Sequence, residues 1–207
     1  KIPPHLGLIV SGGHTLLIDV QGYGDYRLLG RTIDDAAGEA FDKVGRMLNL
    51  PYPGGPEIEK HAREGDPKAF RFPRAVLKEA PLNFSFSGLK TAVLYQLQKL
   101  EDREKHLSDV CASFQEAVID SLVKKTIRAA QESGHTTLTV SGGVACNKAL
   151  QQGLMTAAER QGMSLKLTPP ALTTDNAGMI AFAALLAFEH REHDSLAIGI
   201  DPNLALA

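Results

Sequence analysis

The sequence contains few cysteines, no excess of either charge and no long apolar run. Cys111 and Cys146 are the only cysteines in 207 residues, which is too few for a disulfide framework and predicts a reducing, cytoplasmic location. The 22 Lys and Arg against 24 Asp and Glu give a net charge of −2, so no global basic field indicates nucleic acid, although a local basic patch, or a partner's, remains compatible with RNA. No apolar run approaches the roughly 20 residues that span a bilayer, so no membrane partner is expected.

The start of the chain lacks an initiator methionine and a signal-peptide pattern. Residues 1–5 lead almost at once into a strongly apolar segment, so we expect a chain that begins partway through a larger protein. Low-complexity segments are also absent. The hydrophobic content of 43% and charged content of 22% are ordinary for a globular protein, and the length suffices for one large domain or two small lobes.

One short pattern occurs twice in the chain: a β-rich apolar stretch that runs into Ser-Gly-Gly, at residues 8–13 and again at 138–143. Paired glycines after a strand let the backbone approach a ligand closely and leave N–H groups pointing outward, which suits a phosphate. Each copy alone is equally compatible with a tight turn that has no chemical role. Two copies far apart in the chain predict two loops that close on one nucleotide-like ligand.

Hydrophobic periodicity predicts an α/β order of elements. Strands are expected at 6–11, 15–20, 25–31, 137–141 and 165–167, the first two as a hairpin across Gly12-Gly13-His14. Helices are expected at 33–48, 57–63, 89–100, 107–133, 147–161 and 174–189. Three segments follow: a strand hairpin and helix in 1–64, an irregular stretch with two long helices in 65–136, and a second strand–glycine turn–helix half, with the last helix, in 137–207.

The first predicted helix starts with an unusual number of carboxylates. Asp34 or Asp35 is expected to cap it, since carboxylates favour a helix N-terminus. Asp35, Glu39 and Asp42 are spaced i, i+4 and i+7 and so share one face. A carboxylate face beside a glycine-rich cleft suits ribose hydroxyls or a substrate amine, and both interpretations stay open.

Two further segments can each be interpreted either as purely structural or as functional. Gly55, within Pro53-Gly54-Gly55-Pro56, either brings N–H groups to a ligand at a helix N-terminus or belongs to a stiff corner. Ser87 is expected to cap the next helix, with Lys90 as a weaker candidate for a phosphate or RNA contact. The other Lys and Arg residues between 68 and 90 are expected on a solvated face.

The second glycine turn leads to a helix start at Asn147, whose amide can reach a flat ligand lying on the glycine backbone. Cys146 is expected to be a packing residue, because no histidine stands near it in the sequence. Thr174 or Asp175 is expected to cap the last helix, or Asp175 ligates a metal. A single Asp cannot hold a divalent ion, and His190-x-x-His193 is expected on the solvated surface, so co-ligands are expected outside this chain.

Six ordered motifs together resemble one family. They are VSGGHT (10–15), IDDAAGEAFDK (33–43), YPGGP (52–56), FSFSGLKTA (84–92), VSGGVACN (140–147) and TDNAGMIA (174–181). The set covers nearly the whole chain and resembles the TsaD family, once called Gcp or O-sialoglycoprotein endopeptidase, in its bacterial or organellar form. The resemblance implies an α/β fold of the actin-like ATPase (ASKHA) type, with two lobes around a nucleotide cleft.

The resemblance also implies an activity, partners and site residues. The reaction is transfer of the threonylcarbamoyl group from threonylcarbamoyl-AMP to N6 of adenosine 37 in tRNAs that read codons starting with A. The family works with a TsaB-like paralogue and a TsaE-like ATPase, and binds one iron or zinc ion. Carried over by motif, Asp175 is the metal ligand and the substrate-binding residues are Ile9, Val10, Ser11, Gly12, Gly13, Asp42, Gly55 and Asn147.

The chain departs from the family pattern by lacking the amino-terminal lobe, with its first phosphate hairpin and the His-x-x-x-His pair that supplies other metal ligands. We therefore expect an incomplete ASKHA fold that, by itself, neither binds metal nor turns over. No Ser-His-Asp or Cys-His set supports the old peptidase name. An activated mixed anhydride needs electrostatic stabilisation more than a covalent nucleophile.

Two alternative functions stay open. The first is a noncatalytic ASKHA module that binds a nucleotide or a partner, as TsaB-like paralogues do. The presence of Asp42, Asn147 and Asp175 together disfavours it, because a decayed site should have lost some of them. The second is an actin-like sugar kinase, for which the chain shows no recognisable sugar-binding segment.

Overall fold

The centre of the molecule is a five-stranded sheet. The computed structural model describes residues 2–190 and the single residues 195, 197 and 199. The strands are β1 (His5–Val10), β2 (Thr15–Gly22), β3 (Asp25–Arg31), β4 (Thr137–Ser141) and β5 (Ser164–Leu167), in the spatial order β3-β2-β1-β4-β5. The first three form an antiparallel meander, while β4 runs parallel to β1 and β5 runs parallel to β4. The predicted hairpin and the α/β class are confirmed.

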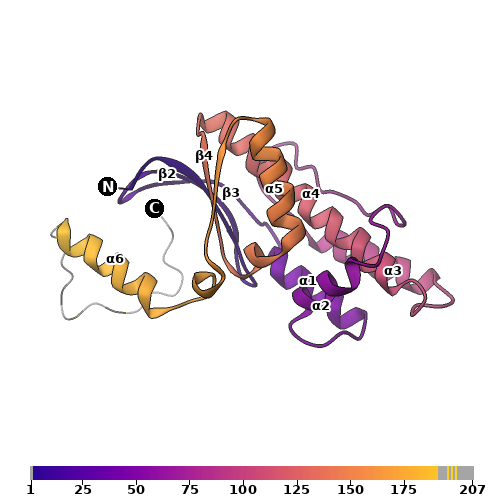
Figure 1. Cartoon of the computed structure of the whole chain (residues 1–207). Coiled ribbons are helices and arrows are strands. Elements are labelled where there is room, and N and C mark those ends of the chain that lie inside the picture. Colours follow the sequence, from indigo (N-terminus) through magenta and orange to yellow (C-terminus); the bar gives the residue numbers. More distant parts are fainter. Residues whose placement is uncertain (1, 191–194, 196, 198, 200–207) are drawn as a thin grey trace.

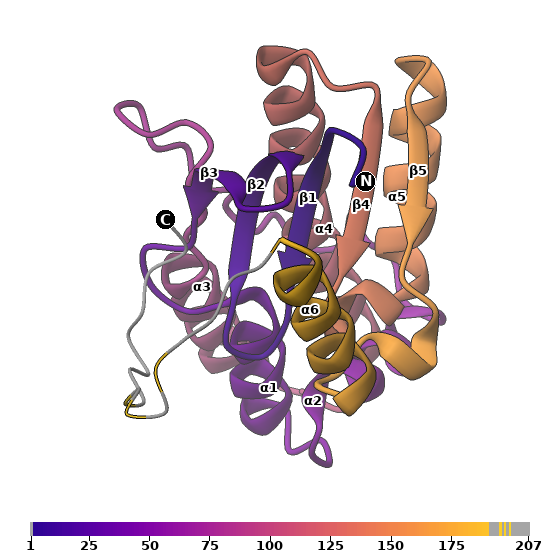
Figure 2. The ribbon, with the colours of Figure 1, turned by 90° about the vertical axis from the view of Figure 1, so that its left-hand side faces the viewer.

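Helices lie on both sides of this sheet, and most of them pack on one face. They are α1 (Ala37–Met47), α2 (Gly54–Ala62), α3 (Ser87–Lys99), α4 (Leu107–Ser133), α5 (Lys148–Arg160) and α6 (Ala177–Glu189), with 3₁₀ turns η1 (Gly143–Cys146) and η2 (Pro170–Leu172). In Figure 1, α4 and α5 lie along one side of the sheet, whereas α6 lies on the other side. Figure 2 shows α1 and α2 below the ends of the strands.

The core lies between the sheet and α4. The helix predicted at 107–133 has an apolar stripe of Val110, Phe114, Val118 and Leu122, which are all 0% exposed. Phe114 meets Phe41 of α1 edge-on, with ring centroids 5.2 Å apart. Buried residues of segments 1–64, 65–136 and 137–207 all belong to this one core, and the division into three segments stays a prediction.

The starts of several helices differ from the predicted ones. α2 already begins at Gly54, inside the expected corner, and α1 and α6 begin later than expected, at Ala37 and Ala177. The last helix is capped by Asn176, whose Oδ1 accepts the Met179 N–H at 3.0 Å, so the predicted cap at Thr174 or Asp175 is wrong. The second member of the pair at positions 190 and 193 lies outside the described residues.

Asp19 forms a group of hydrogen bonds at the end of the strands opposite the glycine turns. Asp19 of β2 is 2% exposed and its Oδ1 lies 2.6 Å from Nε2 of His135, which precedes β4. Arg27 of β3 donates to the other oxygen at 2.8 Å. Burial alone would raise the pKa of Asp19, but the hydrogen bond to His135, the largest influence, lowers it together with the other donors. The carboxylate of Asp19 therefore joins β2, β3 and the segment that precedes β4.

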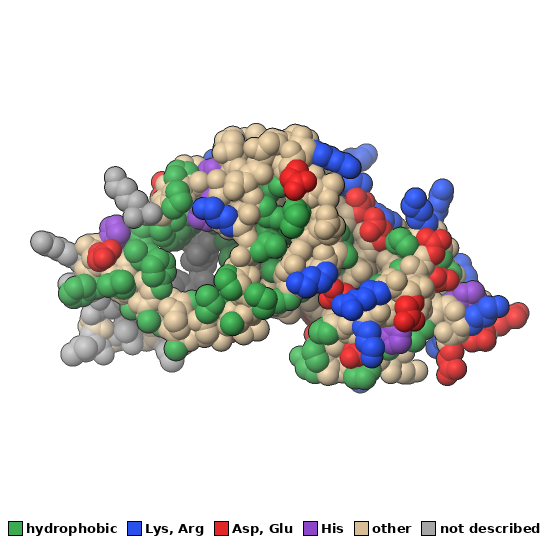
Figure 3. Space-filling view, in the orientation of Figure 1, with side chains coloured by type: hydrophobic (Ala, Val, Ile, Leu, Met, Phe, Trp, Pro, Cys, Tyr) green, Lys and Arg blue, Asp and Glu red, His purple; other side chains and the backbone are tan. Residues whose placement is uncertain are grey.

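Helix α6 stands apart from the core. None of its residues is buried, and the exposed fractions are 63% for Ile180, 58% for Phe182 and 71% for Phe188. Figure 3 shows hydrophobic side chains gathered over this helix. Within the described part of the chain, no helix has both the length and the apolar character needed to cross a membrane.

Candidate functional site

The two Ser-Gly-Gly turns lie side by side at one edge of the sheet. Strands β1 and β4 pair in parallel, with Leu8 opposite Val140 and Ile9 opposite Ser141, so their following turns leave the sheet at the same edge. Figure 2 shows both strands pointing toward α1 and α2. The carboxyl edge of parallel strands is where open α/β sheets bind ligands. The prediction that the two turns come together is confirmed.

Gly142 makes this close approach possible. Its φ is +95°, a conformation that side-chain-bearing residues rarely adopt, and a Cβ there would overlap the carbonyl oxygen of Val10. The second turn therefore packs directly on the backbone of β1. Any larger residue would push the two turns apart.

The first turn is tied to the start of α1. Gly38 N–H donates to the Ser11 carbonyl at 3.1 Å, and the buried Thr15 hydroxyl accepts the Ala37 N–H at 2.9 Å. A Cβ on Gly38 would come within 2.8 Å of the Gly12 backbone. The N–H groups of Gly13 and His14 turn inward to the Ser11 hydroxyl, at 3.3 and 3.0 Å. An incoming anion would compete with that hydroxyl for them.

The turns and the first helices enclose a cleft of about 400 Å³. This volume lies within the range of small-molecule sites. Of the predicted substrate-binding residues, Gly12, Asp42, Gly55 and Asn147 line the cleft. Ile9 and Val10 lie in β1 behind the turn, and Ser11 and Gly13 flank Gly12 within it. The structure thus brings residues from both halves of the chain to one cavity, and their binding role stays a prediction.

Asp42 holds the second wall of the cleft in place. One of its carboxylate oxygens, Oδ1, accepts the Gly54 N–H at 2.8 Å and so fixes the start of α2 against α1. The two helices approach closely here, since a Cβ on Gly45 would lie 2.8 Å from the Gly54 Cα. The position of Gly55 at the cleft follows from this contact.

Asn147 is buried, and both the oxygen and the nitrogen of its side-chain amide form hydrogen bonds. Its Oδ1 accepts the Leu150 N–H at 2.9 Å, which caps α5. Its Nδ2 donates to Oε1 of Gln115 on α4 at 2.7 Å. The Lys148 N–H donates in turn to Glu59 of α2 at 2.9 Å. The predicted helix start is confirmed, and Asn147 lines the cleft while both groups of its amide bind within the protein.

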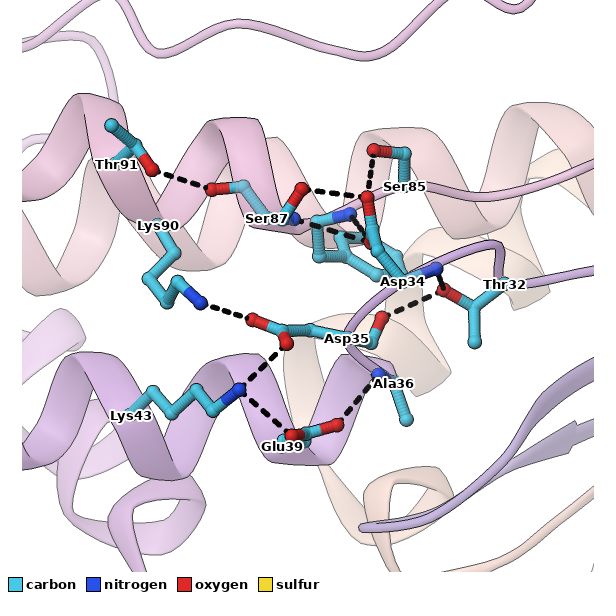
Figure 4. Close-up of polar contacts among 11 residues, drawn as sticks. Thr32, Asp34, Asp35, Ala36, Glu39, Lys43, Ser85, Ser87, Lys90 and Thr91 are labelled. Carbon is cyan, nitrogen blue, oxygen red and sulfur yellow. Dashed lines mark hydrogen bonds and ion pairs between the residues drawn. The ribbon is translucent and has the colours of Figure 1, made fainter.

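The predicted carboxylate face is divided, since of its three members only Asp42 lines the cleft. Asp35 binds Lys43 at 2.6 Å and Lys90 at 2.7 Å, and Glu39 binds Lys43 at 2.8 Å (Figure 4). Burial would raise the pKa of Asp35, but the hydrogen bonds from the two lysines outweigh it and lower the pKa. Lys90 is therefore held by a carboxylate in the segment just before α1. Pairing with Asp35 and Glu39 also raises the pKa of Lys43.

Asp34 does not cap its own helix but serves α3. Its carboxylate accepts the Phe86 N–H at 2.8 Å, the Ser85 hydroxyl at 2.5 Å and the Ser87 hydroxyl at 2.6 Å (Figure 4). Ser87 is the first residue of α3 and donates its hydroxyl, so its predicted role as the cap is wrong. The cap comes from a distant segment because the orphan N–H groups of α3 point toward Asp34.

Asp175 lies next to the cleft but alone. It is exposed, and its neighbour Thr174 lines the cavity. Throughout the described residues, no group of three or more His, Cys, Asp or Glu side chains is placed to hold a metal ion. A single exposed carboxylate is too few ligands for a divalent cation, so the described residues do not by themselves form a metal site.

The two cysteines lie in different surroundings, one in the core and one at the cleft. Cys111 is 0% exposed in the core, and burial raises the pKa of its thiol to about 12. Cys146 lines the cleft, but its Sγ contacts the Thr173 hydroxyl at 3.4 Å. The packing role predicted for Cys146 stays a prediction.

Several cleft residues were missed from the sequence. Gly38 stands one helical turn before Asp42 in α1, and Glu59 stands one helical turn after Gly55 in α2. Helical spacing from the predicted residues would have found both of them. Tyr52 also lines the cavity and carried no periodic signal, because it lies in a loop.

The sheet order, the helices on its face and the cleft at the paired glycine turns define an α/β protein of the actin-like ATPase (ASKHA) type. Two solved HypF structures share this fold. The structure of HypF from T. kodakarensis has a TM-score of 0.68 at 16% identity and covers 92% of this chain and 34% of that one. Full-length HypF in a phosphate- and nucleotide-bound form has a TM-score of 0.67 at 11% identity, with 93% and 34% covered.

Sequence comparison identifies the family. The model of TsaD, tRNA N6-adenosine threonylcarbamoyltransferase, matches residues 1–182, and the chain belongs to this family. Proteins of that name from Anaeromyxobacter sp. (strain Fw109-5) and Syntrophotalea carbinolica are 52% and 53% identical, over 96% and 87% of this chain. The chain spans 60% and 53% of their respective lengths.

Proposed function

We propose that the complete protein transfers the threonylcarbamoyl group from threonylcarbamoyl-AMP to N6 of adenosine 37 in tRNAs that read codons starting with A. The observation that carries the proposal is the cleft formed by two glycine turns on adjacent parallel strands, with Asp42 and Asn147 in its walls. It occurs in a chain 52% identical to enzymes named for this reaction. One of the two solved structures that share the fold is described as phosphate- and nucleotide-bound, which supports a nucleotide-like ligand for this fold.

The chemistry expected of these residues is binding and charge stabilisation. The N6 amine attacks the acyl carbon, the bond from that carbon to the phosphate oxygen breaks, AMP leaves, and N6 loses a proton. The backbone N–H groups near Gly12 and Gly143 are suited to the negative charge of the phosphate. Asp42 and Asn147 fix the wall geometry through Gly54 and Gln115. Cys111 is buried in the core, and the reaction as written needs no covalent intermediate on a cysteine.

A reconstituted reaction tests this function. The product of the complete gene, supplied with threonylcarbamoyl-AMP, unmodified tRNA and its partners, should yield threonylcarbamoyl-adenosine in the digested tRNA, detected by mass spectrometry. The Anaeromyxobacter relative, treated identically, is the control. Absence of the modified nucleoside from the first reaction, with product in the second, contradicts the proposal.

We further propose that Asp175 supplies one ligand to an iron or zinc ion, with the other ligands from parts of the protein beyond this chain. Support comes from its place beside the cleft and from the match to the family motif. Asp175→Ala in the complete protein should lose both bound metal, measured by elemental analysis, and tRNA modification. Unchanged metal content would remove the assignment.

The proposed setting is the cytoplasm, in a complex with a TsaB-like paralogue and a TsaE-like ATPase. The two unpaired cysteines support a reducing compartment. Co-purification of the two partners with the tagged complete protein tests the complex.

A further inference from the structure

The proposed reaction requires an adenine that has left its stack. An enzyme that reacts with an exocyclic amine must reach it outside the base stack, and unstacked bases in RNA loops are commonly held on aromatic rings. The inference below rests on the proposed function, because it concerns the second substrate of the same cleft.

Two aromatic side chains line the cleft among the described residues, and they differ in availability. Phe41 is 2% exposed and packs edge-on against Phe114, so its faces are covered by the core. Tyr52 is 85% exposed, although a large aromatic ring gains by burial. Tyr52 is therefore the one with a ring surface open to a ligand.

The loop that carries Tyr52 is anchored at both ends. The Leu50 N–H donates to the Gly45 carbonyl at 2.9 Å, and the Gly54 N–H donates to Asp42 at 2.8 Å. Pro51 and Pro53 flank the tyrosine and fix their own φ angles. The ring thus projects from a restrained backbone, which lowers the entropy lost when a partner binds. Figure 3 shows hydrophobic side chains at this lower rim, over the loop between α1 and α2.

Tyr52 also lines a second hollow, of about 290 Å³, on the other side of the loop. This hollow shares Asp42 with the cleft and is lined by Lys43 and Arg46. Lys43 is paired with Asp35 and Glu39, whereas the exposed Arg46 forms no ion pair with any residue in the described part of the chain. An open ring with a free guanidinium beside it matches the base and phosphate of single-stranded RNA.

We propose that Tyr52 is the stacking platform for the acceptor adenine of the RNA substrate, and that Arg46 contacts a backbone phosphate next to it. The base stacks on the ring at the mouth of the cleft, with its N6 amine directed to the acyl donor inside. The hollow beyond the loop receives the adjoining backbone.

A binding experiment with matched hairpins tests the platform. The probes are an anticodon stem-loop with unmodified adenosine at the acceptor position and the same hairpin with an abasic site there, titrated into the product of the complete gene. Tyr52→Ala should weaken binding of the adenosine hairpin by about 5- to 100-fold and leave the abasic hairpin unchanged, because one base stack is lost. Tyr52→Phe should bind like the original protein.

Two controls make the result specific. Tyr95→Ala removes another exposed ring, 59% exposed on α3, and should change neither affinity. Arg46→Ala should weaken both hairpins equally and reduce the dependence of affinity on salt by about one counterion.

Three results overturn the inference while leaving the proposed function intact. They are equal RNA affinity for Tyr52→Ala and Tyr95→Ala, loss of AMP affinity in Tyr52→Ala with RNA affinity unchanged, and an original protein that modifies tRNA but does not distinguish the two hairpins. AMP binding is measured in parallel by calorimetry and should be unaffected by Tyr52→Ala. Failure of the original protein both to bind AMP and to modify tRNA would instead remove the proposed function.

Discussion

Asp34 joins the segment between β3 and α1 to the start of α3, which is distant in the chain. It follows β3, yet its carboxylate accepts hydrogen bonds from Ser85, Phe86 and Ser87 at the start of α3. Burial would raise its pKa, but the serine hydroxyls and backbone N–H groups together outweigh this and lower it. A folded pKa below the unfolded value means that the charged carboxylate stabilises the fold above about pH 4.

The variant Asp34→Asn tests this stabilisation by its dependence on pH. At pH 7 the free energy of unfolding should fall by about 1 kcal/mol, a small value because the site is partly exposed. Asp34 loses its charge as the pH falls from about 4 through its folded pKa, so the difference between the two proteins should shrink there. Urea unfolding between about pH 2.5 and 7 measures it, with the exposed Asp25→Asn as control. A difference that stays constant with pH contradicts the argument.

At the scale of the elements, α1 and α2 owe their close packing to glycine. Gly45 and Gly54 face each other where the helices meet, and a Cβ on Gly54 would lie 2.7 Å from the Phe41 carbonyl. The same crossing positions Gly55 and Tyr52 at the cleft. Helix packing and site geometry therefore depend on the same contact.

The substitution Gly54→Ala should weaken both the packing of α1 against α2 and the geometry of the cleft. The added methyl meets backbone atoms, which cannot move aside, so we expect a loss of about 1–3 kcal/mol in the free energy of unfolding. AMP affinity should also fall, because α2 is displaced from the cleft. Gly88→Ala in α3 is the matched control, since a Cβ added there would meet no atom within 4 Å and its stability should stay equal or rise. Equal stability of the two variants would refute this account.

Elements with strong local patterns were predictable, and their mutual contacts were not. The bounds of α4, β3 and β4 agree with those predicted from the sequence, and in α4 and β4 the apolar spacing matches the buried positions. The approach of the two glycine turns followed from their repetition. The cap of α3 by Asp34 and the pairing of Asp35 with Lys90 are long-range, and no local pattern encodes them. Tyr52 was missed because it lies in a loop, where the sequence has no periodic pattern.

On the scale of the whole molecule, α6 is the element that contributes nothing to the core. All of its large apolar side chains are partly or largely exposed, and a contiguous apolar surface of this kind favours association. The remainder of the sheet and helices share one buried cluster that does not include it.

The triple variant Ile180→Ser, Phe182→Ser and Phe188→Ser should reduce self-association without lowering the stability of the fold. Its free energy of unfolding should stay within about 1 kcal/mol of the original, since surface substitutions cost little. Self-association, measured by light scattering, should decrease. Phe84→Ser at a 1% exposed site is the contrast and should lose about 3–5 kcal/mol. Marked unfolding of the triple variant would show that α6 does pack on the core.

The parallel pairing of β1 with β4 has a consequence for biosynthesis. One wall of the cleft follows the first strand of the chain, and the facing wall follows a strand made long afterwards, with the meander and four helices in between. During synthesis, β1 can pair with β2 as soon as both strands have left the ribosome. The other edge of β1 stays unpaired until β4 has been made. Nascent chains that stop before Gly143 therefore lack one wall of the cleft, however well the β1–β2 hairpin has folded.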